Sequence, residues 1–267
     1  MGLFDVHAHL THPEFAADLP AVLARAKAAG LTRIISNGLN LVDNAAVLEL
    51  SRREPMVRPA LGLYPVDAVL PEMRAAGIDY PREGVEHTAI ETIDFIRAHI
   101  DSAIAVGEVG LDGYWVPASL WSRQDEVFET LVRLAISHDK PLIVHSRKRE
   151  PRALELLEAL GAQRVLWHCF GSKLKLVRRI VEKGHYVSIP ANARRSESFS
   201  KMLQTLPRTQ LLLETDCPYL PPRVGERNEP SATRETLSFA AELWNTSLEA
   251  TLGQFESNYE RLFREAP

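Results

Sequence analysis

His7 and His9 form the first pattern in this sequence that could bind a metal ion. They lie at the end of a short apolar run that predicts a β-strand over residues 3–7. Side chains at positions i and i+2 of an extended segment point to the same side, so the two imidazoles can reach one ion together. Two surface histidines at this spacing also arise by chance. The hypothesis of a metal site therefore depends on finding further ligands elsewhere in the chain.

Other side chains that bind metals follow four more apolar, strand-like segments of the chain. They are Glu108, His145, His168 and Asp216. Taken singly, each has an ordinary structural explanation: a histidine can end a strand without a function, Glu108 can cap a turn, and Asp216 can be the N-cap of the next element. These explanations do not account for six such residues at the ends of five strands.

Eight apolar, β-rich segments alternate with amphipathic helical patterns along the chain. The predicted strands are residues 3–7, 33–36, 57–63, 103–108, 141–145, 164–168, 186–189 and 211–213. Continuous apolar strands separated by helices predict a parallel sheet covered by helices. For a chain of 267 residues we predict a single-domain (β/α)8 TIM-type barrel over residues 1–267, with a doubly wound open sheet as the alternative. In such a barrel the six metal-competent residues would meet on the face where active sites are built.

Two local sequence patterns predict where a helix begins and where a long loop lies. Residues 11–14, Thr-His-Pro-Glu, have the form of a capping box, with Pro13 early in a helix that Gly30 would end. Three prolines between residues 64 and 84 predict a long loop with little regular structure.

The composition is that of an ordinary soluble globular protein, with 45% hydrophobic and 25% charged residues and a formal net charge of −4. No apolar run approaches the roughly 18–20 residues of a membrane span, and the first residues lack the pattern of a secretory signal. The two cysteines, Cys169 and Cys217, do not make a disulfide framework, so we expect a cytoplasmic protein. The mild acidity argues against non-specific coating of nucleic acid, but it allows an enzyme that binds a few phosphates.

Four imidazoles and two carboxylates are too many ligands for one tetrahedral zinc ion. They suit two divalent ions about 3.5–4 Å apart, whose identity (Zn, Mn, Mg, Fe or Ni) the ligand types leave open. We expect His7, His9 and Asp216 on one ion, His145 and His168 on the other, and Glu108 between them. Asp216 can also accept a proton from the attacking water. The predicted reaction class is metal-assisted hydrolysis, with Glu108 and Asp216 as its catalytic residues.

Several stretches resemble the TatD-type metal-dependent hydrolases (TatD DNase family) of the amidohydrolase-like superfamily. The matching stretches are residues 5–9, 107–112, 144–147, 167–170 and 213–220, and residues 225–230 fit the loop that follows the last motif. The resemblance implies a TIM-type barrel, a dinuclear metal site with the ligands named above, and phosphodiesterase activity on DNA, in places as a 3′→5′ exonuclease. This chain has Tyr64 where members often carry histidine, and Gly171-Ser172 where many have the reverse order.

Substrate binding would require cations that are not metal ligands. Arg147 and Arg227 are the candidates for phosphate contacts. Asp112 and Asn228 are candidates either for supporting the metal ligands from behind or for orienting the substrate. Aromatic residues of the predicted rim could stack on bases of a single strand or could only pack the loops. These aromatic residues are Tyr64, Tyr114, Trp115, Phe170 and Tyr219.

The expected partner is single-stranded DNA as substrate, without a membrane or an obligate protein partner. An amidase, a deacylase or a small-ester hydrolase with the same metal pair is the alternative enzyme. A barrel that serves only as a binding scaffold is the non-enzymatic alternative.

Overall fold

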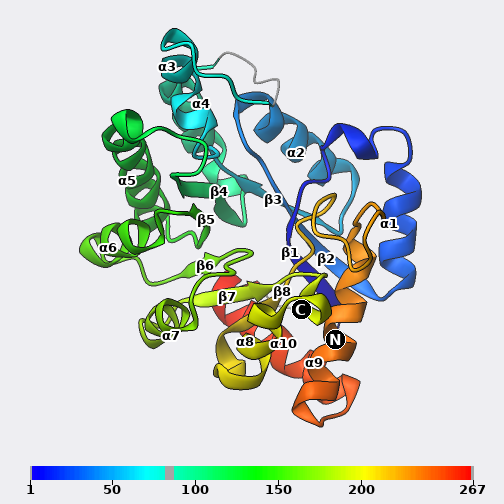
Figure 1. The fold of residues 1–267 in the computed structure, drawn as a ribbon. Coiled ribbons are helices and arrows are strands. Elements are labelled where there is room, and N and C mark those ends of the chain that lie inside the picture. Colours follow the sequence, from blue (N-terminus) through cyan, green and yellow to red (C-terminus); the bar gives the residue numbers. More distant parts are fainter. Residues whose placement is uncertain (1, 82–86, 266–267) are drawn as a thin grey trace. The chain divides into compact units, whose positions relative to one another are not determined.

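The computed structural model describes residues 2–81 and 87–265, and its strands form one sheet in the order β1 to β8 (Figure 1). The strands are β1 Leu3–Ala8, β2 Leu31–Asn37, β3 Val57–Leu61, β4 Ala105–Asp112, β5 Leu142–Arg147, β6 Val165–Trp167, β7 Tyr186–Ile189 and β8 Leu211–Leu213. Their order in the sheet equals their order in the chain, and one or more helices follow each strand. This is the (β/α)8 TIM-type fold predicted from the sequence.

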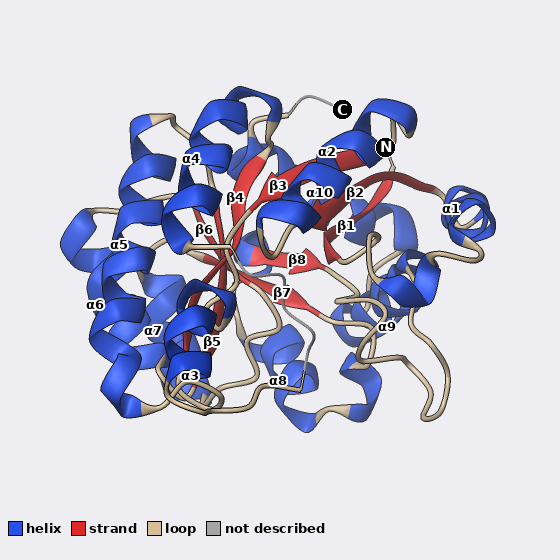
Figure 2. Cartoon of the chain, turned by 90° about the horizontal axis from the view of Figure 1, so that it is seen from above, coloured by secondary structure: helices blue, strands red, loops and turns tan. Residues whose placement is uncertain are grey.

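Figure 2 shows the helices that alternate with these strands. They are α1 Leu19–Ala28, α2 Leu41–Arg53, α3 Leu70–Ala75, α4 Ala89–His99, α5 Trp121–Ser137, α6 Glu150–Leu160, α7 Leu174–Glu182, α8 Glu197–Thr205, α9 Thr233–Trp244 and α10 Leu248–Phe263. The longest, α5, buries the apolar stripe that its sequence predicts, which includes Val127, Leu131 and Leu134.

The residues group into two compact units. The first unit contains Met1–Ser36, Leu50–Arg58 and Leu166–Pro267, and the second contains Asn37–Glu49 and Pro59–Val165. In the first unit, β1 pairs in parallel with β2, and Ala8 forms a bridge to Cys217 in the segment after β8. The first strand and the segment after the last strand are thus joined directly.

In the second unit β4 and β5 are the most extensively paired strands, and both are longer than predicted. The pairing continues through Val109–Val144 and Gly110–His145 to Asp112–Arg147. The prediction that Glu108 and His145 end their strands is therefore wrong, since both lie inside them. The ladder of backbone hydrogen bonds continues past the predicted ends of both strands, through the polar residues Ser146 and Arg147 of β5, and a polarity pattern cannot show this.

Two further local predictions are corrected by the structure. Thr11 does not cap a helix: His12 caps the single turn Pro13–Phe15, its Nδ1 accepting from the N–H of Glu14. The helix α1 begins only at Leu19, where Pro20 occupies one of the first positions that proline favours.

The predicted loop over residues 64–84 contains the helix α3, and residues 82–84 lie outside the described part. Proline occupies the first turn of α3, where no intrahelical N–H is needed. Leu70 and Met73 are buried, and Met73 joins an apolar cluster with Val66, Val69 and Val116. Burial of these side chains stabilises a helix that the prolines concealed in the sequence.

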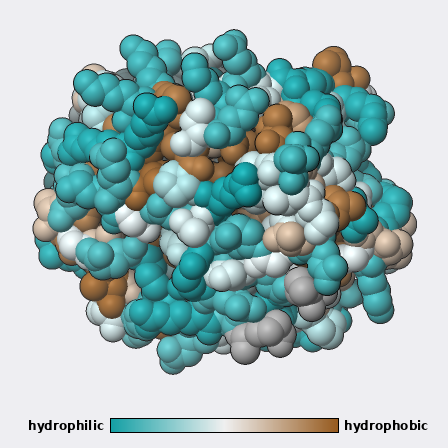
Figure 3. Space-filling model, turned by 90° about the horizontal axis from the view of Figure 1, so that it is seen from below, coloured by the Kyte–Doolittle hydropathy of each residue, from teal (hydrophilic) through white to brown (hydrophobic). Residues whose placement is uncertain are grey.

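Figure 3 shows one face of the molecule, on which hydrophilic residues predominate and apolar residues form small groups. The large apolar side chains exposed among the described residues come from many elements: Val42, Ile90, Tyr114, Ile136, Tyr219, Val224 and Leu248. Within the described chain, every helix is too short or too polar to cross a lipid bilayer.

Candidate metal centre

His7, His9 and Asp216 form a compact group of possible metal ligands in the first unit, with one ligand atom from each within 4.8 Å of the others. The Nε2 atoms of the two histidines are 3.2 Å apart, and the Asp216 Oδ1 atom lies 3.4 Å from Nε2 of His9 and 3.6 Å from Nε2 of His7. Both imidazoles are buried and the carboxylate is largely so. Two imidazole nitrogens and a carboxylate oxygen are a donor set that divalent transition metals accept.

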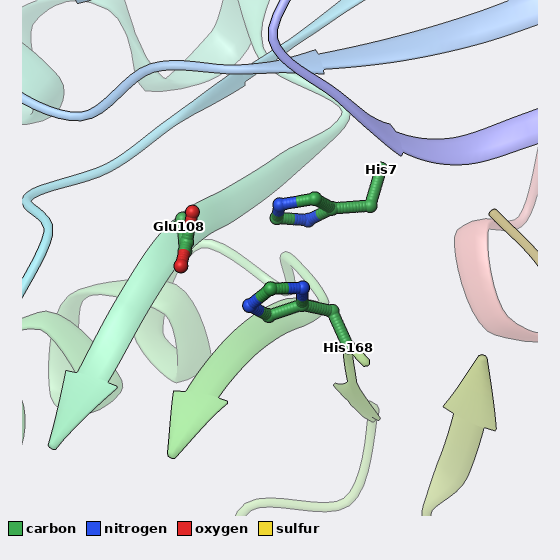
Figure 4. A group of neighbouring side chains, drawn as sticks. All are labelled: His7, Glu108 and His168. Atoms are coloured by element: carbon green, nitrogen blue, oxygen red, sulfur yellow. The ribbon is translucent and has the colours of Figure 1, made fainter. Parts of the chain in front are cut away.

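His168, just after β6, stacks on His7. Figure 4 shows the two rings face to face, together with Glu108 of β4. The ring centroids of His7 and His168 are 3.8 Å apart and the rings are inclined by only 9°. The Nδ1 atom of His168 lies 3.9 Å from the carboxylate of Glu214. His168, which was predicted to share an ion with His145, thus lies beside His7 of the first predicted ligand group.

Asp216 is fixed by its backbone as well as by its neighbours. Its N–H donates to the carbonyl of His7 over 2.8 Å. Its φ of 57° lies in the left-handed region, which residues other than glycine rarely adopt and which often marks functional sites. Burial alone would raise the pKa of Asp216, but the hydrogen bond with His9 and the charges of His7 and His168 outweigh it and hold the pKa below its ordinary value. The side chain is therefore a carboxylate, as a ligand must be.

Asp5 connects β1 to the segment after β8, a role that the sequence reasoning missed. Its side chain is buried and accepts hydrogen bonds from the hydroxyl and the N–H of Thr215 and from the N–H of His7. Burial raises the pKa of this carboxyl to about 7, despite these hydrogen bonds. The available signal was the position of a charged residue inside an otherwise apolar strand, where it requires hydrogen-bond partners.

Glu214 was also overlooked, although it follows β8 directly. It is fully buried and accepts hydrogen bonds from the Ser188 hydroxyl over 2.8 Å and from the Cys169 N–H over 2.7 Å. Burial raises its pKa well above the ordinary value. Through the bond to Cys169, Glu214 positions the backbone next to His168, and it is two residues from Asp216. Its role is to hold two predicted ligands in place.

The second unit contains a group in which His145 lies between two buried carboxylates. Its Nδ1 is 3.0 Å from Oε1 of Glu108, and its Nε2 is 3.1 Å from Oδ2 of Asp112. Burial alone would lower the pKa of His145, but the hydrogen bonds and charges of Asp112 and Glu108 raise it to about 9. The ring of Tyr64 meets the ring of His145 edge to face, with centroids 5.0 Å apart.

Asp112 also organises the loop that follows β4. Its Oδ1 accepts the N–H groups of Tyr114 over 2.7 Å and Trp115 over 2.8 Å. Burial by itself would raise the pKa of Asp112, but the hydrogen bonds from His145 and from the two N–H groups hold it below its ordinary value. Asp112 thus contacts a predicted metal ligand and the loop backbone, and its predicted part in orienting the substrate stays a prediction.

Two glycines allow the close approach of strands at this group. A Cβ atom at Gly62 would lie 2.3 Å from the backbone nitrogen of Glu108, and one at Gly110 would lie 1.9 Å from the carbonyl oxygen of His145. Gly110 also has a φ of +147°, which side-chain-bearing residues rarely adopt. Glycine at these positions is therefore required by the packing of the strands that carry Glu108 and His145.

Two of the predicted substrate-binding residues contact the protein itself. Arg227 forms a two-pronged ion pair with Asp18 over 2.9 and 2.7 Å and lies over the ring of Phe15. Asn228 is buried: its amide donates to the carbonyls of Thr215, Tyr219 and Leu220, and its oxygen accepts the N–H of Glu229.

Arg147 also contacts an aromatic ring, and its guanidinium lies 3.7 Å from the ring centre of the half-exposed Tyr114. Its side chain is exposed, and no carboxylate of residues 2–81 and 87–265 lies within ion-pair distance of it, in contrast to Arg227.

Sequence comparison with known proteins supports the family resemblance that the motifs indicate. The family model described as TatD related DNase matches residues 4–264. An uncharacterised metal-dependent hydrolase of Bacillus subtilis, YabD, is 31% identical over 98% of this chain and 99% of its own length. The 3′–5′ ssDNA/RNA exonuclease TatD of Edwardsiella piscicida is 30% identical over 98% of this chain and 99% of its own.

A solved structure gives the same result for the fold. The crystal structure of YjjV, a TatD homologue from Escherichia coli, superposes with a TM-score of 0.84 at 25% identity and covers 99% of this chain and 98% of that protein. The resemblance inferred from the sequence motifs is confirmed. The chain belongs to the TatD-related DNase family and is a metal-dependent hydrolase.

Proposed function

We propose that this protein is a divalent-metal-dependent phosphodiesterase that degrades single-stranded DNA, removing nucleotides in the 3′→5′ direction. The observation that carries the proposal is the group of His7, His9 and Asp216, whose ligand atoms lie within 4.8 Å of one another. Family membership supports the nuclease reaction, and the name of the Edwardsiella piscicida relative supports both the strandedness and the polarity.

Two ions per chain fit the donor set better than one. His7, His9 and Asp216 would hold the first, His145 and His168 would hold the second, and Glu108 would bind both through its two oxygens. Divalent ions at such a site lower the pKa of a bound water and neutralise charge on the phosphate. Zinc, manganese, magnesium, iron and nickel remain candidates, since histidine and carboxylate ligands accept several of them.

The protein's own groups would supply the remaining steps. Asp216, a carboxylate with a lowered pKa, would accept the proton of the attacking water. Water adds to phosphorus while the bond from phosphorus to the 3′ oxygen of the neighbouring nucleotide breaks. Asp112 would orient His145, and the exposed guanidinium of Arg147 would contact a phosphate oxygen. Cys169 and Cys217 are not joined in a disulfide, which supports a cytoplasmic location.

The decisive experiment loads the purified protein with each candidate metal and supplies single-stranded oligonucleotides labelled at the 5′ end. We expect a ladder of products shortened from the 3′ end, which chelator abolishes. Asp216→Asn should retain part of its metal and lose at least about 100-fold in turnover, as expected for loss of a general base. A fully active Asp216→Asn would refute the role of Asp216 as base.

A matched panel of carboxylic esters and amides tests the alternative enzyme. An active, metal-loaded preparation that hydrolyses members of this panel but leaves every phosphodiester intact would replace the nuclease by an amidase, deacylase or esterase.

A further inference from the structure

Two cations at the end of β5 lie over one aromatic ring. The guanidinium carbon of Arg147 is 3.7 Å from the ring centre of Tyr114, and Nζ of Lys148 is 4.8 Å from the same centre. Both basic residues are exposed, and the Tyr114 side chain is 46% exposed. Cations bind to the face of an aromatic ring because of its electron-rich π-system, so the ring restrains the flexible side chain of Arg147.

The ring is positioned by the same carboxylate that holds a predicted metal ligand. Asp112 accepts the N–H of Tyr114 with one oxygen and contacts Nε2 of His145 with the other. Asp112 and Arg147 are paired across the ends of β4 and β5, and the N–H of Gly113 donates to the carbonyl of Arg147 over 2.8 Å. Arg147 therefore has a fixed backbone and ring contact two residues beyond His145, on the same side of the strand.

The charge on Arg147 is not balanced by a neighbouring acid. Three other arginines of the loops are paired: Arg227 with Asp18, Arg223 with Glu226 and Glu235, and Arg194 with Glu242. In residues 2–81 and 87–265, neither Arg147 nor Lys148 has a carboxylate within ion-pair distance. A guanidinium stacked on a ring keeps its in-plane N–H groups free to bind two oxygens of a phosphate.

We propose that Arg147, Lys148 and Tyr114 form a clamp for a backbone phosphate of the single strand, next to the phosphate that is cleaved. Tyr114 acts in this clamp by holding Arg147 and not as a stacking platform for a base, because the two cations already lie over its ring. The proposal deepens the proposed nuclease function and rests on it for the identity of the ligand.

The clamp can be tested by measuring how tightly a fluorescent oligonucleotide binds at several salt concentrations. Binding is measured on metal-loaded Asp216→Asn protein and on wild-type protein in chelator, so that cleavage does not interfere. We expect Arg147→Ala to bind about tenfold more weakly at low salt, because it loses a hydrogen bond between charged groups. The slope of log K against log salt should fall by about 0.7 for Arg147→Ala and again for Lys148→Ala, as for one phosphate contact each on a single strand.

Arg133→Ala is the matched control, because it removes the same charge from the exposed face of α5, where Arg133 pairs with Glu129. Its affinity and salt slope should equal those of the wild type. If Arg147→Ala behaves in the same way as this control, the clamp does not exist.

The role of Tyr114 is separated from base stacking by a strand that lacks bases. We expect Tyr114→Leu to weaken binding equally on normal and abasic oligonucleotides, and to add no further loss in the Arg147→Ala protein. Tyr114→Phe keeps the ring face and should bind as the wild type does. A loss that disappears on the abasic strand would show that Tyr114 stacks on a base and would overturn the proposed role. Thermal unfolding of each variant confirms that it is folded.

Failure of the clamp and failure of the nuclease function give different results. If the protein cleaves DNA and its Arg147 and Tyr114 variants bind the oligonucleotide as the wild type does, the proposed nuclease function stands and the clamp is refuted. If binding depends on Arg147 and Tyr114 but no metal supports cleavage, the phosphate site stands and the proposed nuclease activity is refuted.

Discussion

At the scale of single residues, the buried carboxylates explain how the site can exist before it binds a cation. Glu108 is 2% exposed, and its Oε1 lies 3.0 Å from Nδ1 of His145. A buried carboxylate without a partner would cost several kcal/mol, so the contact with His145 offsets this cost in the absence of an ion. Asp5 and Glu214 receive hydrogen bonds from the backbone instead. These two residues support ligands, and the sequence did not reveal them because support depends on three-dimensional neighbours.

Glu108→Ala tests whether this carboxylate is shared by two ions. We expect the metal content to fall from about two ions per chain towards one or none, and kcat to fall by about 100-fold or more, because both ions would lose a ligand. Elemental analysis of the purified variant and its rate on an oligonucleotide measure the two effects. Glu129→Ala, on the exposed surface of α5, is the control. A Glu108→Ala protein that still binds two ions would show that Glu108 is not a bridge.

At the scale of elements, the sequence predicted which segments are strands better than where they end. The stretch from Val109 to Asp112 continues β4 because its backbone pairs with β5. Its glycine and its aspartate, Gly110 and Asp112, are residues typical of loops, and in this strand both lie beside His145. The sequence left two roles open for Asn228, support of the site or contact with substrate, and in the structure its amide bonds three carbonyls of the loop after β8. Single polar residues in loops cannot be assigned to substrate or scaffold without knowing their hydrogen-bond partners.

Asn228→Ala should loosen the loop that carries Asp216. The variant leaves buried carbonyls without donors, which we expect to lower the free energy of unfolding by about 1–3 kcal/mol. Because Asp216 loses its support, kcat should fall more than affinity for the oligonucleotide. Denaturant titration and steady-state kinetics measure both effects, with the exposed Gln163→Ala as control. Wild-type stability together with wild-type kcat would contradict a positioning role for Asn228.

At the scale of the whole molecule, the alternation of eight apolar segments with helical patterns, together with the chain length, predicted the (β/α)8 fold. Eight apolar runs separated by helical patterns leave few other arrangements. The order of metal-competent residues at or near strand ends then predicted His7, His9 and Asp216 as a group, and the structure brings those three together. The substrate-binding residues were harder to predict, because the contacts of exposed arginines such as Arg147 and Arg227 depend on which acids the fold places beside them.

Removing metal should lower the melting temperature of the intact protein. At an ion concentration 100 times its Kd, binding contributes about 2.7 kcal/mol of stability, which corresponds to a shift of roughly 5–10 °C for a chain of this size. Scanning calorimetry with and without chelator measures the shift. His9→Ala should show a much smaller shift, because it lacks one ligand of the first ion. If chelator leaves the melting temperature of the wild type unchanged, the protein does not bind the ion through its folded site.

The join between β1 and the segment after β8 has a consequence for how the protein is made. Asp5 and Thr215, which are bonded to each other, are 210 positions apart in the chain. A ribosome synthesises the N-terminal strand first, so His7 and His9 emerge long before Asp216 exists. His7, His9 and Asp216 can therefore come together only after β8 and the segment that follows it have been synthesised. Chains that end before β8 would lack Asp216, the proposed base, and we expect them to be inactive.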